Sequence, residues 1–136
     1  MIRTIVKDSM LLNRKAEPAG IEDVSTAQDL FDTLRAHHEE CVGMAANMIG
    51  IQKAMIAVDM GNMILVMFNP VIIKKKGLYE VSEGCLSLTG MRNTKRYQEI
   101  TVTYQDPALH SHTMDFQGFT AEIIQHEMDH LKGILI

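Results

Sequence analysis

A short pattern near the end of the chain limits the fold most strongly, because it pairs two histidines four residues apart with an acidic side chain. The pattern consists of His126, Glu127 and His130. Residues i and i+4 lie on one face of an α-helix, so the two imidazoles can bind one metal ion if this segment is helical. Glu127 would then lie beside the metal, where a carboxylate can exchange protons with a bound water. The pattern predicts a C-terminal helix that carries part of a metal site.

Length and composition indicate one ordinary globular domain, spanning 1–136. The chain is 46% hydrophobic and 22% charged, which suits a compact domain with its own core. No apolar run approaches the roughly 20 residues of a membrane span. Lys7 and Asp8 stand where a secretory signal would have its apolar stretch, so we expect a cytoplasmic protein without membrane contact. The net charge of −4 argues against a direct nucleic-acid partner.

The two ends of the chain are predicted to be helical. A first helix is expected at about 26–38, with Ser25 as its N-cap residue. The final helix is expected at 120–132, with Gly133 directly after its end. The segment 41–50 contains two glycines and is expected to be a loop.

The middle of the chain predicts short antiparallel strands. Tight turns are expected at Gly61-Asn62, Lys76-Gly77 and Asp106-Pro107. The strands themselves are expected at 54–59, 63–69, 71–75, 78–82, 99–104 and 111–116. We therefore predict an α+β fold, in which antiparallel β-strands pack around a C-terminal metal-binding helix, with an additional N-terminal helix.

The third metal ligand must lie upstream of the two histidines. Only six residues follow His130, and among them only Lys132 has a side chain that could bind a metal, poorly while charged. The best upstream candidate is Cys85, which follows an expected strand and a flexible glycine, Gly84. A thiolate and two imidazoles leave a fourth position for water, as in catalytic sites. The alternative is that Cys85 is simply a small buried side chain.

Three segments in a fixed order resemble the peptide deformylases over nearly the whole chain. That family carries the motifs G-x-G-x-A-A-x-Q, E-G-C-L-S and Q-H-E-x-D-H. The corresponding segments here are 41–48, 83–87 and 125–130. The second and third match completely. The first matches in part, because Cys41 replaces the first glycine and Met48 replaces the final glutamine.

The resemblance implies an enzyme that removes the formyl group from the N-terminal formylmethionine of new polypeptides and releases formate. By similarity, Cys85, His126 and His130 bind one divalent metal ion. The family usually uses Fe²⁺, while Zn²⁺, Ni²⁺ or Co²⁺ can occupy the same site, and the sequence does not choose among them. Glu127 is the implied general base. The implied oxyanion donors are the metal, the backbone N–H of Leu86 and the side chain at position 48.

Met48 is the departure that bears most on activity, because a thioether donates no hydrogen bond. Loss of one oxyanion donor can lower the rate by about 10²–10³. The amides of Asn47 and Gln52 are the nearby groups that could compensate. Two alternatives therefore stay open: a weakened deformylase-like protein that binds metal and peptide, or a metallohydrolase of another N-acyl or peptide bond.

The resemblance also implies where the substrate binds. The methionine side chain would enter an apolar pocket whose matching positions are Val42, Phe119 and Ile123, although these residues could equally be plain core. Backbone groups near Gly43 and Leu86 would pair with the extended peptide.

The implied partners are N-formylmethionyl peptides, with at most transient contact to the ribosome. Some family members dock there through a segment beyond the metal-binding helix, and because this sequence ends at Ile136 we do not expect docking by that route. Near the cysteine motif, we expect either Arg92 or Arg96 to pair with Glu83.

Overall fold

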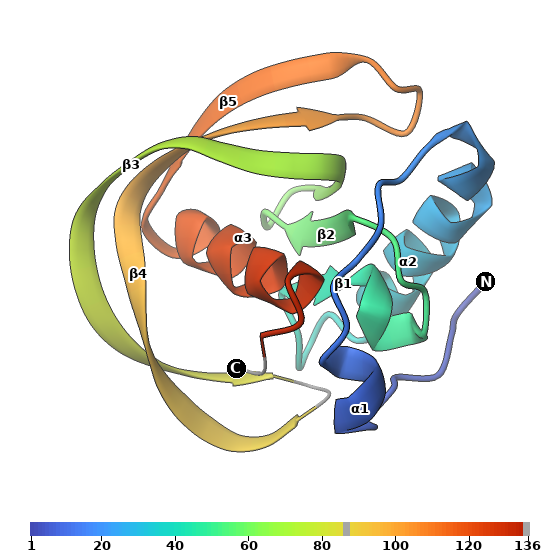
Figure 1. The fold of residues 1–136 in the computed structure, drawn as a ribbon, viewed down its shortest axis with the longest axis horizontal. Helices are drawn as coiled ribbons and strands as arrows, with labels where there is room; N and C mark the ends of the chain where they lie inside the picture. Colours follow the sequence, from blue (N-terminus) through green and yellow to red (C-terminus); the bar gives the residue numbers. More distant parts are fainter. Residues whose placement is uncertain (86–87, 135–136) are drawn as a thin grey trace.

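The computed structural model describes residues 1–85 and 88–134, and the predicted oxyanion donor Leu86 lies outside this range. Five strands form one antiparallel sheet in the order β1-β2-β3-β4-β5. Their bounds are β1 Gly43–Ala45, β2 Met55–Asp59, β3 Ile64–Cys85, β4 Leu88–Gln105 and β5 Ser111–Gln117. The α-helices are α1 Ser9–Leu12, α2 Val24–Ala36 and α3 Gly118–Leu131. The predicted α+β fold is confirmed: the strands curve around α3, and α2 lies nearer the N-terminus (Figure 1).

Strand β3 is much longer than the sequence predicts, since three expected strands merge into one. The predicted turn at Lys76-Gly77 is wrong, because the pairing with β4 continues on both sides of Gly77. Gly77 has a φ of +81°, a conformation that glycine adopts without strain. Register shifts at three further places bend the same pair of strands. The β3–β4 ribbon therefore wraps around α3 and brings Cys85 back toward the helix (Figure 1).

Three local predictions in the first fifty residues need correction. The helix begins at Val24 rather than 26, because the short 3₁₀ helix Ile21–Asp23 leads directly into it. The residue at the N-cap position is therefore Asp23 and not Ser25. The expected loop at 41–50 contains strand β1 and a 3₁₀ helix, Ala46–Ile49, whose residues are all buried.

Helix α3 is the central helix of the fold, and its prediction is confirmed to within two residues. It ends with backbone hydrogen bonds from Gly133 to His130 and from Ile134 to Asp129. This is the pattern of a helix terminated by a left-handed glycine, and Gly133 has a φ of +78°. Gly133, three residues after the last histidine of the motif, therefore fixes the end of the helix at Leu131.

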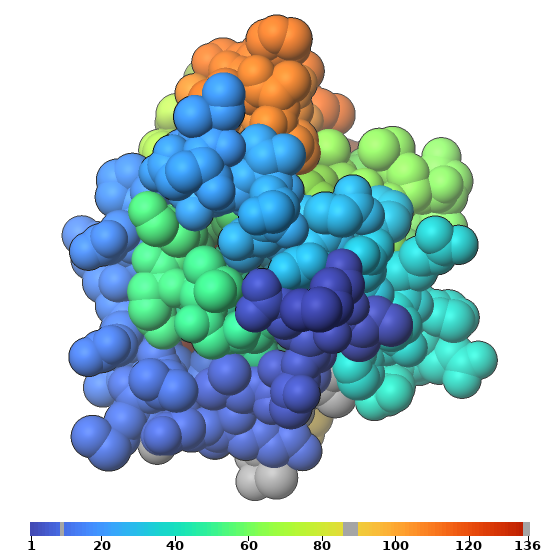
Figure 2. All heavy atoms as spheres, turned by 90° about the vertical axis from the view of Figure 1, so that its right-hand side faces the viewer, coloured from blue at the N-terminus to red at the C-terminus, as the bar shows by residue number. Residues whose placement is uncertain are grey.

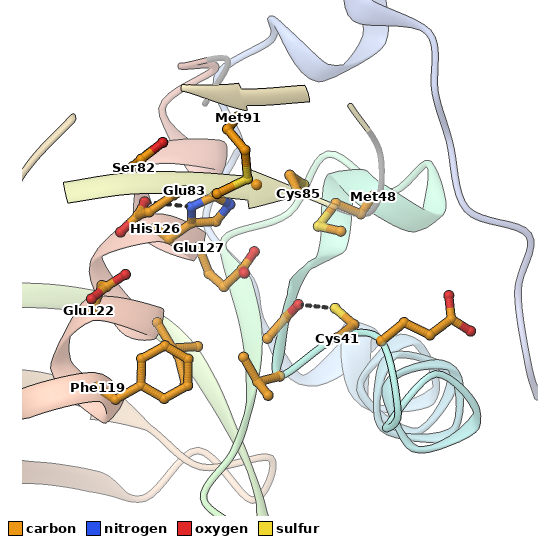
Figure 3. A pocket seen from close by; sticks show the side chains of 15 residues that line it. Cys41, Met48, Ser82, Glu83, Cys85, Met91, Phe119, Glu122, His126 and Glu127 are labelled. Carbon is orange, nitrogen blue, oxygen red and sulfur yellow. Dashed lines mark hydrogen bonds and ion pairs between the residues drawn. The ribbon is translucent and has the colours of Figure 1, made fainter. Parts of the chain in front are cut away.

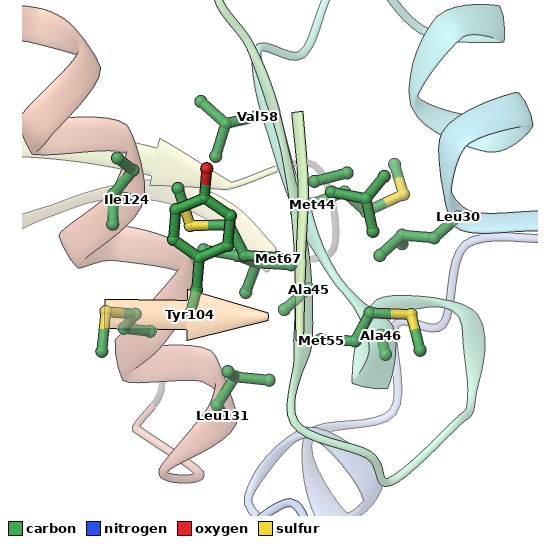
Figure 4. Packing of buried hydrophobic residues seen from close by; sticks show 14 of the residues in the cluster. Leu30, Met44, Ala45, Ala46, Met55, Val58, Met67, Tyr104, Ile124 and Leu131 are labelled. Carbon is green, nitrogen blue, oxygen red and sulfur yellow. The ribbon is translucent and has the colours of Figure 1, made fainter. Parts of the chain in front are cut away.

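The hydrophobic core fills the space on both sides of β1 and β2. Figure 4 shows Ile124 and Leu131 of α3 facing Tyr104 and Met67, while Leu30 of α2 packs near Met44 on the other side. Four methionines are almost completely buried, namely Met44, Met48, Met55 and Met67. Methionine fits irregular gaps well, so these four fill the core as the composition suggests.

The N-terminal segment lies across the outer side of this core (Figure 2). Its backbone is attached by hydrogen bonds from Val6 N–H to the Met48 carbonyl and from Arg3 N–H to Thr33 Oγ1. Among the helices in the described part of the chain, none has the length and apolar character to cross a lipid bilayer.

Candidate metal centre

Three potential ligand atoms converge where the end of β3 meets α3. Cys85 Sγ lies 3.3 Å from His130 Nε2, and His130 Nε2 lies 3.2 Å from His126 Nε2. All three atoms lie within 4.8 Å of one another. The structure thus brings together the two histidines of one helix face and the cysteine predicted from a distant segment.

The spacing of these atoms fits a single metal ion. Bond lengths of about 2.0–2.1 Å to nitrogen and about 2.3 Å to sulfur place tetrahedral ligands roughly 3.3 Å (N to N) and 3.6 Å (S to N) apart. The observed separations are 3.2 Å and 3.3 Å. The donor set therefore matches a small divalent cation in both chemistry and spacing.

A buried carboxylate orients His126. Its Nδ1 donates a hydrogen bond to Glu83 Oε1 over 2.8 Å. In the neutral imidazole this leaves the lone pair on Nε2, the atom that faces Cys85 and His130. The hydrogen bond thus holds His126 in the tautomer and orientation that a metal ligand needs.

Glu83 is held in turn by Arg96, which confirms that one of the two nearby arginines pairs with it. Arg96 donates to Glu83 Oε1 from Nη2 over 2.7 Å, and to Asp129 Oδ2 from Nη1 over 2.7 Å. Burial raises the pKa of Glu83, but the hydrogen bonds from His126 and Arg96 outweigh it and lower the pKa to about 2. Asp129 belongs to the third motif, but the sequence analysis assigned it no role.

The electrostatic environment favours a positive charge at this centre. Burial lowers the pKa of His126, yet its hydrogen bonds to Cys85 and Glu83 and the charge of Glu127 outweigh burial and raise the pKa to about 10. Burial, together with the charge of His126, lowers the pKa of His130 to about 4. The anionic groups thus favour a positive charge on His126, whereas burial and that charge disfavour one on His130.

Glu127 lies next to the cluster without a partner for one of its oxygens. The side chain is buried, and Oε1 has no hydrogen-bond partner among the described residues. Burial raises the pKa of Glu127 to about 7. A β-carbon on Gly43 would lie 2.9 Å from Glu127 Oε2 and 2.5 Å from Ile123 Cγ2. Only glycine therefore lets β1 approach α3 so closely above this carboxylate.

A cleft of about 250 Å³ opens beside these groups (Figure 3). All four predicted substrate-contacting residues line it, namely Val42, Gly43, Phe119 and Ile123. Val42 is 38% exposed and Phe119 is 63% exposed, so these two are not plain core, whereas Ile123 is buried. The cleft is also lined by Cys41, Glu122 and Met91, none of which the sequence marked as substrate contacts.

Met48 lines the cleft as well, and the two side-chain amides considered from the sequence, those of Asn47 and Gln52, are engaged elsewhere. Its Sδ accepts a hydrogen bond from Ala45 N–H over 3.4 Å. The Asn47 amide donates to the His130 carbonyl over 2.8 Å, and the Gln52 amide donates to the Leu11 carbonyl over 3.1 Å. Neither amide lines the cleft. The compensation considered from the sequence is therefore not seen.

A helix carrying His-Glu-x-x-His beside a cysteine in a cleft defines the class of metal-dependent hydrolases. The family model described as polypeptide deformylase matches residues 2–136, so the chain belongs to the polypeptide deformylase family. It is 54% identical to a peptide deformylase of Clostridium beijerinckii, with 100% of both chains covered. It is 35% identical to a peptide deformylase of Thermus thermophilus, covering 92% of this chain and 74% of that relative.

Solved structures show the same fold. The crystal structure of a peptide deformylase from Thermus thermophilus matches with a TM-score of 0.88 at 33% identity, covering 99% of this chain and 84% of that one. An actinonin-bound class I type b peptide deformylase from Acinetobacter baumannii matches with a TM-score of 0.88 at 30% identity, covering 99% and 95%. The fold and the enzyme class expected from the resemblance are therefore confirmed.

Proposed function

We propose that this enzyme uses one divalent ion, held by Cys85, His126 and His130, to hydrolyse the N-formyl group of N-terminal formylmethionine. The reaction consumes one water and yields formate and the free amine. The observation that carries the proposal is the convergence of three donor atoms within 4.8 Å of one another, beside Glu127, whose Oε1 has no hydrogen-bond partner among the described residues. We also propose that residues 1–136 act as one catalytic domain, because the described elements that carry the site, β1, β3 and α3, pack around one hydrophobic core.

The groups of the site have separate roles in the proposed reaction. When bound, the divalent ion supplies a Lewis acid and lowers the pKa of its water. Glu127 accepts a proton from the attacking water and returns it to the departing amine nitrogen, a role that suits a carboxyl whose pKa burial raises to about 7. The backbone N–H of Leu86 is proposed by resemblance as a donor to the oxyanion.

We propose Fe²⁺ as the working metal. One thiolate and two imidazoles suit the borderline divalent metals, so Zn²⁺, Ni²⁺ and Co²⁺ also fit this donor set. Metal analysis of protein purified without oxygen identifies the ion. Fe²⁺ is the expected result, and zinc alone in active protein would contradict it.

The cleft supports a substrate made of an apolar side chain and extended backbone. We propose that Val42, Phe119 and Ile123 receive the methionine side chain, and that backbone groups at Gly43 pair with the peptide. Because the substrates are newly made chains, we propose the cytoplasm as the compartment, with only transient contact to the ribosome.

Because the Met48 side chain donates no hydrogen bond, we expect this enzyme to catalyse the reaction slowly. The two remaining oxyanion donors would be the metal and one backbone group. In other enzymes, removal of one oxyanion donor lowers kcat by about 10²–10³. We therefore propose a deformylase whose chemical step is weakened, rather than a protein that only binds formylated peptides, since Glu127 is retained.

The decisive experiment is formate release from formyl-Met-Ala-Ser. The protein is loaded with Fe²⁺ without oxygen, or with Ni²⁺ in air, and compared with Glu127→Ala. We expect formate from wild type and almost none from Glu127→Ala. Glu99→Ala serves as the matched control, because Glu99 is exposed and pairs with Lys76 far from the cleft. Equal formate release by wild type and Glu127→Ala would overturn the proposal.

A further inference from the structure

Met91 is an exposed methionine that lies over the backbone next to the metal centre. It is 66% exposed and lines the cleft. Met91 on β4 is the register partner of Gly84 on β3. A β-carbon on Gly84 would lie 2.9 Å from Met91 Sδ. The absence of a side chain at Gly84 therefore makes room for this thioether directly beside Cys85.

Met91 lies on the opposite side of the cleft from the proposed methionine pocket. In Figure 3, Met91 and Phe119 stand on opposite sides of His126 and Glu127. Successive side chains of an extended peptide point in opposite directions. When the formylmethionine side chain points toward Phe119, the side chain of the next residue points toward Met91.

The chemistry of Met91 suits contact with varied apolar side chains. A methionine side chain is unbranched and has three rotatable bonds, so it adapts to neighbours of different shapes. Glu83, which precedes the register partner of Met91 on the neighbouring strand β3, is buried and already engaged by Arg96 and His126. The side chain of the second residue would therefore meet mainly an apolar, polarizable surface.

Building on the proposed function, we propose that Met91 contacts the residue that follows formylmethionine and makes the enzyme prefer aromatic and large aliphatic residues there. Sulfur–aromatic contacts of this kind correspond to about two- to tenfold in affinity. Because such a contact forms equally in the bound substrate and in the transition state, it lowers KM and leaves kcat unchanged.

The first test compares formyl-Met-X-Ser peptides in which X is Phe, Leu, Ala or Ser. Wild type is expected to favour Phe over Ala by about two- to tenfold in kcat/KM, through KM, and Met91→Leu, which keeps the apolar surface but lacks the sulfur, by a smaller factor. Met91→Ala should reduce this ratio to near one. Met63→Ala is the matched control, since Met63 is 52% exposed at the β2–β3 turn and lies outside the cleft. It should keep the wild-type preference.

The second test measures contact without turnover. In protein labelled at the methionine methyl groups and loaded with Zn²⁺, addition of the product Met-Phe should shift the Met91 signal by a ring current. Met-Ala should shift it much less, and the Met63 signal should not move. Met91→Leu assigns the resonance.

The failures of the two proposals are distinguishable. Equal kcat/KM for all four peptides, or an unshifted Met91 signal with saturating Met-Phe, would overturn the role of Met91 and leave the deformylase activity intact. No formate from any peptide would overturn the proposed function, and with it this inference.

Discussion

Glu83 and His126 are joined by a buried hydrogen bond of 2.8 Å between Oε1 and Nδ1. Through this bond the strand that carries Cys85 is tied to the helix that carries both histidines. Arg96 extends the connection to Asp129 on the same helix. The relative position of the three proposed ligands therefore depends on a network of charged side chains behind them.

Replacement of Glu83 by glutamine is expected to weaken metal binding. Glutamine can still accept from His126 but lacks the charge that holds Arg96, so the imidazole is less firmly oriented. Groups that support a metal ligand in this way are worth about 10- to 100-fold in affinity. Competition with a chromophoric chelator measures the change, and Glu80→Gln on the exposed part of β3 is the control. Equal affinities for the two variants would contradict the role of Glu83.

Replacement of Met48 by glutamine is expected to raise kcat by about tenfold or more, with KM nearly unchanged, because it supplies the missing oxyanion donor. The glutamine oxygen can accept from Ala45 N–H in place of Sδ, leaving the amide nitrogen to donate. Steady-state formate release gives both constants. If the variant folds and binds metal but gains no rate, Met48 is not the cause of slow turnover.

Replacement of Asn47 by alanine is expected to destabilise the fold without specifically slowing the chemical step. Asn47 is buried, and its amide donates to the carbonyl of His130. Loss of a buried hydrogen bond that leaves its partner unsatisfied costs about 1–3 kcal/mol. Urea unfolding measures this loss. Unchanged stability together with a large fall in kcat would instead make Asn47 an oxyanion donor.

Because the folded protein holds the thiol of Cys41 in its protonated form, we expect the free energy of unfolding to fall at alkaline pH. Burial raises the pKa of Cys41 to about 12, and its Sγ donates to the Gly43 carbonyl. The unfolded chain loses this proton near pH 9, so stability from this group is complete below pH 9 and declines as the pH rises toward 12. Between pH 8 and 10 wild type should lose about 1 kcal/mol more than Cys41→Ser. Equal losses by urea unfolding would contradict the buried neutral thiol.

The sequence predicts best where chemistry and local periodicity act together. The two histidines require a helix to share one metal ion, and Cys85 offers a further donor directly after an expected strand and a flexible glycine. Both deductions use residue types and spacing alone, and the structure brings these atoms together. The helix end at Gly133 is also a local signal, because only the last turn and one glycine decide it.

What the sequence did not predict depends on contacts between distant segments. Gly77 carries the same local signal in a turn and in a bent strand, and the pairing with β4 decides between them. The side-chain amide of Asn47 donates a hydrogen bond to the carbonyl of His130, 83 residues away. Met91 lies over Gly84 because of the register of two strands, which no local pattern specifies.

The metal content of three proteins tests the central claim most directly. Wild type, Cys85→Ser and Cys41→Ser are purified in parallel, loaded with Co²⁺ or Zn²⁺, and their bound metal is counted. Both cysteines line the same cleft, but only Cys85 Sγ lies 3.3 Å from His130 Nε2. We predict one tightly bound ion in wild type and in Cys41→Ser, and weak or no binding in Cys85→Ser. Equally tight binding of one ion by Cys85→Ser would contradict the proposed metal centre.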